Sequence, residues 1–167
     1  GVLLKMGGYG MLRIAYPFFP EAAAGMGGVI SALSVIAIVY GALVAMAQTD
    51  LKKLIAYSSV SHMGFVTLGL ASGTPEGLNG AMFMMLAHGT ISAMLFMIVG
   101  VIYERAHHRD IDRFGGLAWA MPRYGVLASF AFFASLGLPG LSGVIAEIVT
   151  LIGAFNGPFA WAALISL

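Results

Sequence analysis

The sequence predicts an all-α fold, a polytopic transmembrane helix bundle in which one helix is discontinuous. Of the 167 residues, 60% are hydrophobic and only 9% are charged, whereas about 25% of the residues of a soluble domain are charged. Apolar stretches of about 20 residues, the length that crosses the hydrocarbon core of a bilayer, follow one another with short polar connections between them. The last long stretch is interrupted by a proline and several glycines. These features are typical of a membrane protein.

Five stretches are long and apolar enough to form, or to complete, a membrane-spanning helix. They cover residues 1–16, 26–47, 54–72, 78–103 and 124–155, and a further helix begins at 159–167. Because short connections join antiparallel neighbours, we expect a single transmembrane domain over residues 1–167. The sequence begins with glycine and remains apolar to its end, so we expect the chain to be a segment of a longer protein.

Positive charges gather in alternate connections of the predicted bundle. One side carries Lys52, Lys53, Arg105, Arg109, Arg113 and Arg123. The connections of the other side contain Glu21 and Glu76 but no lysine or arginine. Because lysine and arginine accumulate in cytoplasmic connections, the sequence predicts that the first side faces the cytoplasm.

The stretch 124–155 is too long for one straight span. As a continuous helix it would measure about 48 Å, against a hydrocarbon core of about 30 Å. Its middle reads ASLGLPGLSG, in which Pro139 and Gly140 weaken a helix. We expect a break near 137–143, and ion transporters use such discontinuous helices at their binding sites. The alternative is a tilted helix with an ordinary proline kink.

Two charged residues, Lys5 and Glu147, lie inside predicted spans and away from their ends. Lys5 is about 17 Å of helix from Tyr16, which places it near the midplane. A charge there costs at least about 2.5 kcal/mol, so such residues usually face a cavity or a partner and mark an ion path. The alternatives are a purely structural pairing for Lys5 and, for Glu147, a neutral acid that satisfies the broken backbone.

Two histidines, His62 and His88, lie near the centres of their spans. Each shares a helix face with a serine, Ser58 in one helix and Ser92 in the other. Histidine gains and loses protons near neutral pH, so the pair can relay protons. The alternative for each histidine is a hydrogen bond that only holds two helices together.

A different class of function is also open at this point. Two midplane histidines on neighbouring helices can ligate a b-type haem, and Gly64 and Gly89 would leave room for the porphyrin. The chain would then be an electron carrier or a structural membrane anchor. The sequence contains no cysteine and has a formal charge of +1, so it predicts no thiolate metal site and no nucleic-acid partner.

Several strings resemble one family closely. LLKMGGYGMLR, AQTDLKKLIAYSSVSHMGF, MLAHG, YERAHHRDI and GLPGLSGVIAE occur in this order. Together they are similar to the M-type, or chain 4, subunits of proton-pumping NADH:quinone oxidoreductases, respiratory complex I. The wider superfamily also includes subunits of multi-subunit sodium/proton antiporters and membrane-bound hydrogenases. The glutamate at 147 favours the M-type, because the L-type and antiporter relatives typically have lysine there.

The resemblance implies an antiporter-like inverted repeat and assigns roles to residues. Lys5 would be the central proton carrier, His62 and His88 the relay, and Glu147 the entry or exit group. Asp50 and Lys52 would lie at the start of the helix that carries His62. The family also has a glutamate–lysine pair in earlier helices, at positions before residue 1.

The resemblance further implies a subunit of a redox-driven translocase in a bacterial inner membrane, with other membrane-arm subunits and the lipid bilayer as its partners. This chain itself would bind no cofactor and perform no redox chemistry. FMN, iron–sulfur clusters and quinone would be bound elsewhere in the parent complex. The alternative within the superfamily is a subunit of a sodium/proton antiporter or of a membrane-bound hydrogenase.

Overall fold

The computed structural model describes residues 2–167, and this part of the chain is helical with no β-strand. The elements are α1 (Val2–Gly10), a π-helical turn η1 (Met11–Ala15), α2 (Tyr16–Phe18), α3 (Pro20–Met46), α4 (Leu51–Ala71), α5 (Pro75–Ala106), a 3₁₀ turn η2 (Ile111–Arg113), α6 (Leu117–Ala120), α7 (Pro122–Ser135), α8 (Ser142–Asn156) and α9 (Ala160–Ser166). The prediction of an all-α fold is confirmed.

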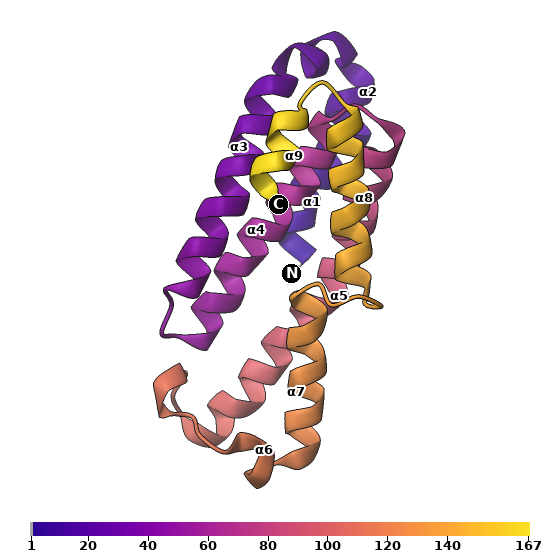
Figure 1. Cartoon of the computed structure of the whole chain (residues 1–167). Helices are drawn as coiled ribbons and strands as arrows, with labels where there is room; N and C mark the ends of the chain where they lie inside the picture. Colours follow the sequence, from indigo (N-terminus) through magenta and orange to yellow (C-terminus); the bar gives the residue numbers. More distant parts are fainter. Residues whose placement is uncertain (1) are drawn as a thin grey trace.

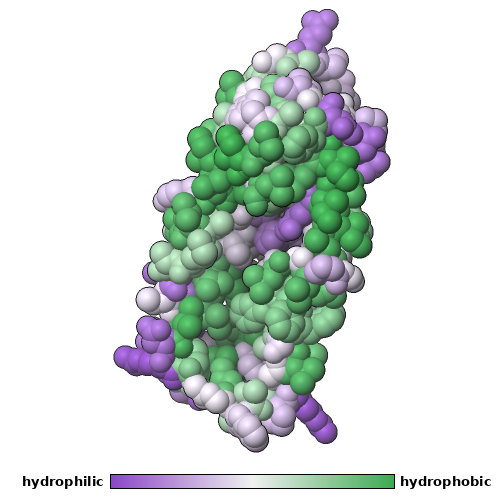
Figure 2. Space-filling view, viewed as in Figure 1, coloured by the Kyte–Doolittle hydropathy of each residue, from purple (hydrophilic) through white to green (hydrophobic). Residues whose placement is uncertain are grey.

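The three longest helices, α3, α4 and α5, are each long and apolar enough to cross a membrane. Figure 1 shows them running along the length of the molecule, with α7 and α8 stacked end to end beside α5. Helix α1 begins at mid-height and occupies one half of the bundle only. The face shown in Figure 2 is largely apolar along its length, and hydrophilic groups lie at its two ends and in a hollow at mid-height.

Helices begin earlier than the predicted spans. Helix α3 starts at Pro20, six residues before the expected 26, and only Phe19 separates it from α2. Helix α5 starts at Pro75, three residues before the expected 78, after Thr74, whose hydroxyl accepts a hydrogen bond from the backbone of Gly77. Proline is favoured in the first turn because its missing N–H is not needed there. The connections are therefore shorter than predicted.

The predicted interruption is present between α7 and α8. Helix α7 ends at Ser135 and α8 begins at Ser142, and Gly137 and Gly140 have φ values of +70° and +97°. Residues with a side chain rarely adopt this left-handed region. The segment is therefore a turn of several residues rather than an ordinary proline kink, and it lies at mid-height of the bundle (Figure 1).

Two apolar clusters fill the bundle on either side of this level. One includes Leu68 of α4 and Met84 of α5 together with residues of α8 and α9. The other includes Ile55 of α4 and Leu95 of α5 together with residues of α7. Along both α4 and α5 the central histidine lies between the two clusters. The bundle therefore has a polar layer at mid-height between two apolar cores.

Glycines let α4, α5 and α8 approach one another closely. A Cβ atom added to Gly80 of α5 would lie 2.5 Å from the backbone nitrogen of Thr150 on α8. One added to Gly69 of α4 would lie 2.5 Å from the carbonyl oxygen of Gly77 on α5. Only glycine permits these separations, because small residues at helix interfaces allow backbones to come together. The result is that α8 packs directly against α4 and α5.

The two connections that carry the positive charges meet at one end of the molecule. Leu51 N–H donates to the carbonyl of Arg109, and Ile111 N–H donates to the carbonyl of Thr49, at 3.0 and 2.9 Å. The carboxylate of Asp50 accepts from the backbone N–H groups of Lys52 and Lys53, at 2.8 and 3.1 Å, and so caps α4.

The carboxylate of Asp50 also interacts with a positive charge, because its Oδ2 lies 3.5 Å from Nε of Arg109. Desolvation raises the pKa of the Asp50 carboxyl, but the backbone donors of Lys53 and Lys52 and the charges of Arg109 and Lys53 lower it, and the net pKa lies below its ordinary value. The stabilisation is therefore complete above the pKa of the unfolded chain and is lost as the pH falls through the folded pKa.

Substitution of Asp50 by alanine is expected to weaken the start of α4 by about 1 kcal/mol at neutral pH, because an N-cap is lost. Hydrogen–deuterium exchange should show the amides of Lys52 and Lys53 exchanging about fivefold faster, the equivalent of that free energy of local opening. Asp112→Ala is the matched control, since that carboxylate caps no helix. Unchanged exchange at 52 and 53 in Asp50→Ala would contradict the capping role.

Candidate functional site

The site begins at Lys5, which α1 holds half-buried against α5. Its Nζ lies 2.5 Å from Nδ1 of His88. His88 is buried, with 4% of its surface exposed. A lysine ammonium has donors only, whereas the ring of a neutral histidine has one donor and one acceptor nitrogen. Lys5 in its charged form therefore donates to His88.

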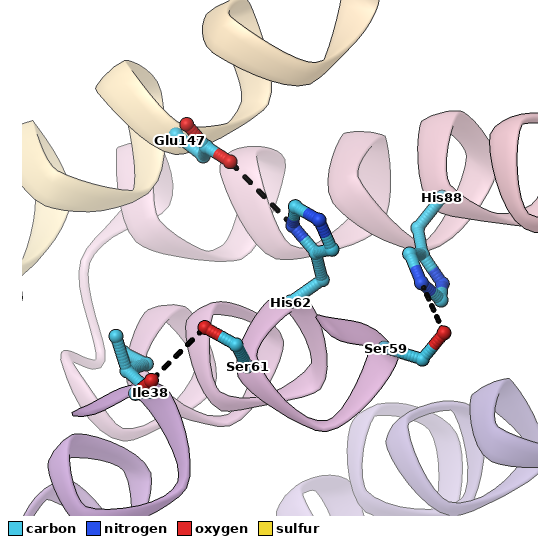
Figure 3. A network of polar contacts seen from close by, with 6 residues as sticks. All are labelled: Ile38, Ser59, Ser61, His62, His88 and Glu147. Carbon is cyan, nitrogen blue, oxygen red and sulfur yellow. Dashed lines mark hydrogen bonds and ion pairs between the residues drawn. The ribbon is translucent and has the colours of Figure 1, made fainter. Parts of the chain in front are cut away.

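The second nitrogen of His88 reaches across to α4. Its Nε2 lies 3.1 Å from Oγ of Ser59 (Figure 3). The Ser59 hydroxyl also lies 2.9 Å from the carbonyl oxygen of Ile55. Ser59 is 3% exposed. Both nitrogens of His88 are thus engaged inside the bundle.

His88 and His62 are neighbours on α5 and α4. Their ring centroids are 5.2 Å apart and the ring planes are inclined by 44°. No direct hydrogen bond joins the rings among the contacts of the described residues. A bridging water is the ordinary way to join polar groups at such a separation, so a proton moving from one ring to the other needs one.

Glu147 of α8 completes the series. Its Oε1 lies 3.5 Å from Nδ1 of His62, and the two side chains are 23% and 15% exposed. Figure 3 shows the His62 ring pointing toward Glu147. Nδ1 of His62 has no hydrogen-bond partner among the described residues, so His62 and Glu147 are not hydrogen-bonded. They are close enough to attract one another when His62 is protonated.

The broken helix also approaches the Glu147 carboxylate. A Cβ atom added to Gly137 would lie 3.0 Å from Oε2 of Glu147. A Cβ atom added to Gly140, which the sequence singles out, would have no neighbouring atom within 4 Å. The turn therefore folds back so that Gly137, rather than Gly140, borders the acid.

The structure brings together all four ionisable residues that the sequence singles out and gives their spatial order. The series runs from Lys5 on α1 to His88 on α5, then to His62 on α4 and Glu147 on α8. A proton that leaves a charged Lys5 and reaches an ionised Glu147 leaves both ends neutral. This is favourable in a medium where an isolated charge is costly.

The two serines that the sequence singles out hydrogen-bond within their own helices. The hydroxyl of Ser58 donates to the carbonyl of Ile55, and that of Ser92 lies 3.5 Å from the carbonyl of Gly89. Each hydroxyl therefore satisfies the backbone of its own helix. Ser58 also lines a cavity together with His62.

Asp50 and Lys52 are distant from the series. They lie at the start of α4, and the twelve residues from Asp50 to His62 correspond to about 18 Å of helix. Asp50 caps the helix, and Lys52 is exposed. Ser59, which hydrogen-bonds to His88, was not singled out by the sequence.

The geometry does not fit a haem. Nδ1 of His88 faces Lys5 and Nε2 faces Ser59, so this ring presents no nitrogen for an axial ligand. The haem-binding alternative therefore finds no support in these residues.

Comparison with known proteins gives concordant results. Residues 1–167 match the family model described as NADH:quinone oxidoreductase/Mrp antiporter, TM. The chain is 54% identical over 155 residues to NADH-quinone oxidoreductase subunit M of Rhodobacter capsulatus, covering 93% of this chain and 30% of that protein. It is 48% identical over 156 residues to NADH-ubiquinone oxidoreductase chain 4 of Chondrus crispus, covering 93% and 32%.

Solved structures agree with these relatives. A chain of respiratory complex I from Thermus thermophilus with bound NADH superposes with a TM-score of 0.94 at 41% identity, covering 99% of this chain and 35% of that one. A chain of the archaeal membrane-bound sulfane sulfur reductase superposes with a TM-score of 0.85 at 28% identity, covering 97% and 35%. The chain spans about a third of the length of the relatives that it matches.

Proposed function

Because this chain belongs to the NADH:quinone oxidoreductase/Mrp antiporter transmembrane family, we propose that it forms part of an M-type subunit that carries protons in the membrane. In the complete enzyme, NADH oxidation and quinone reduction would drive this movement. The observation that carries the proposal is the series of four ionisable side chains, Lys5, His88, His62 and Glu147, in the polar layer of the bundle.

The proton path follows from the donor and acceptor groups. Lys5 gives a proton to Nδ1 of His88, which becomes an imidazolium ion, and Lys5 becomes neutral. The imidazolium ion then releases the proton gained at Nδ1 through water to His62, while Nε2 keeps its hydrogen, so His88 returns to its starting tautomer. His62 gives a proton to the carboxylate of Glu147, whose neutral acid form releases it on the other side of the series. Reprotonation of Lys5 resets the path, so each transfer conserves charge and protons.

The remaining assignments are part of the same proposal. The other membrane-arm subunits would surround this chain, and FMN, iron–sulfur clusters and quinone would be held by the parent complex. The end of the bundle at which the two positively charged connections meet would face the cytoplasm of a bacterial cell. The 54% identity to an NADH-quinone oxidoreductase subunit M favours this enzyme over the antiporter and hydrogenase alternatives.

Removal of His62 is expected to interrupt the path at its middle. In the full-length subunit assembled in its enzyme, His62→Ala should lower NADH-driven proton pumping roughly tenfold, since a positioned proton-transfer group commonly contributes at least that much. Pumping is measured in inverted membrane vesicles as quenching of a pH-sensitive dye. His108→Ala is the control, because His108 stacks on Phe114 in a connection outside the series. Undiminished pumping in His62→Ala would contradict the path.

A further inference from the structure

We propose that Ser59 is a positioning residue for proton transfer between Lys5 and His88. By accepting a hydrogen bond from Nε2–H of His88, Ser59 fixes the tautomer and the orientation of the ring, so that Nδ1 is unprotonated and faces Lys5. The proposal rests on the proton path proposed above and adds a residue to it.

The direction of the Ser59 hydrogen bonds follows from the supply of donors. A serine hydroxyl has one proton to donate and can accept through its oxygen. Ser59 donates that proton to the carbonyl of Ile55 at 2.9 Å, and a carbonyl can only accept. Toward Nε2 of His88, at 3.1 Å, Ser59 therefore accepts, and Nε2 carries the hydrogen.

The contact between Lys5 and His88 requires the same tautomer, with hydrogen on Nε2, for a separate reason. The ammonium group of Lys5 can only donate, so Nδ1 of His88, 2.5 Å away, has to be the acceptor. A neutral imidazole with hydrogen on Nε2 has its lone pair on Nδ1. The contacts at the two ends of the ring thus agree on one tautomer and one orientation.

Because the His88 ring is buried, its tautomer and orientation depend on Ser59. His88 is 4% exposed and Ser59 is 3% exposed, so bulk water does not reach the bond between them. Without the hydroxyl, Nε2–H is left unpaired in the bundle, which is costly. A ring flip would turn Nδ1 away and place a C–H group toward Lys5, and the other tautomer would direct an N–H group at the donors of Lys5. Either change would block transfer.

The adjacent serine provides a matched control. Ser58 and Ser59 both donate to the carbonyl of Ile55, at 2.9 Å each, but only Ser59 contacts His88. Removal of either hydroxyl therefore deletes one hydrogen bond within α4. Only Ser59→Ala deletes a bond to the histidine ring.

The test uses the full-length subunit in its assembled enzyme with three variants, Ser59→Ala, Ser59→Thr and Ser58→Ala. Nitrogen-15 NMR of labelled histidine reports the tautomer, and the His88 signal is identified by its absence in His88→Gln. We expect Ser59→Ala to shift His88 away from the Nε2–H tautomer and to lower NADH-driven pumping roughly fivefold, as for the loss of one buried hydrogen bond. Ser59→Thr, which keeps the hydroxyl, and Ser58→Ala should retain both the tautomer and the pumping.

The contrary outcomes separate the two proposals. If Ser59→Ala keeps the Nε2–H tautomer, or changes the tautomer while pumping is normal, the positioning role is wrong. If pumping falls equally in Ser58→Ala, the effect is a general loss of helix packing and the positioning role is again wrong. If His88→Gln itself pumps normally, the proton path fails, whatever the Ser59 variants show.

Discussion

Replacement of Glu147 by glutamine is expected to lower NADH-driven proton pumping by at least about tenfold in the assembled enzyme. Glutamine has nearly the same size as glutamate, so the packing of α8 against α4 and α5 should be retained. It has no carboxylate to take up a proton, however, and Glu147 is the proposed proton acceptor next to His62, with Oε1 3.5 Å from Nδ1. The expected loss is therefore a loss of proton transfer rather than of structure.

The control for Glu147→Gln is Glu76→Gln. Glu76 is an exposed acid in the first turn of α5 and lies outside the series. Pumping and quinone reduction are measured on the same vesicles, and subunit content is checked by immunoblot. Glu147→Asp should retain part of the activity, because it keeps a titratable carboxyl on a shorter side chain. Normal pumping in Glu147→Gln would show that protons bypass this residue.

Removal of the Lys5 amino group should have an equally large effect, seen as a fall of roughly tenfold in coupled NADH:quinone reduction. Lys5 is the donor to His88 at the start of the series, and without it the imidazole has no proton source on α1. Lys5→Ala is compared with Lys53→Ala, which removes an exposed lysine at the start of α4. Lys53→Ala should leave turnover close to that of the unmodified enzyme.

Lys5→Arg separates charge from proton transfer. Arginine keeps the positive charge and the donors but does not release its proton in proteins. If Lys5 acts as a proton carrier, Lys5→Arg should be impaired nearly as much as Lys5→Ala. Full turnover in Lys5→Arg would mean that a fixed positive charge is sufficient at this position, and the carrier role would be wrong.

The ionisable residues were predictable from the sequence because a charge or a histidine in an apolar span is conspicuous. Lys5 and Glu147 are conspicuous by charge, and His62 and His88 by their central positions. Their spatial order was not predictable, since it depends on which helix faces meet. Those faces are set by close approaches such as that of Gly80 to Thr150, and a pattern of single glycines does not reveal its partners.

The sequence also could not show which of the adjacent serines, Ser58 or Ser59, contacts His88, for a similar reason. One residue along a helix changes the direction of a side chain by about 100°, so although Ser58 and Ser59 both donate to the carbonyl of Ile55, the hydrogen bond to His88 is made by Ser59. The four-residue spacing of Ser58 and His62 drew attention to Ser58 and gave no signal for Ser59. Only the packing of α4 on α5 shows that Ser59 faces His88.

The helix interruption was predictable in place but not in detail. Pro139 and the surrounding glycines indicate a break, and α7 and α8 are separate helices. The residue that borders the acid, Gly137, is recognisable only from the path of the turn. The π-helical turn Met11–Ala15, which follows the helix of Lys5, has no signal in the sequence, although such turns are frequent at functional sites.

The central claim is that protons pass through the series that begins at Lys5 and ends at Glu147. The most direct test is the number of protons translocated per NADH oxidised, measured in proteoliposomes that contain the enzyme with Lys5→Ala or with Lys53→Ala. We predict that the ratio falls in Lys5→Ala and is unchanged in Lys53→Ala. An unchanged ratio in Lys5→Ala would contradict the proton path.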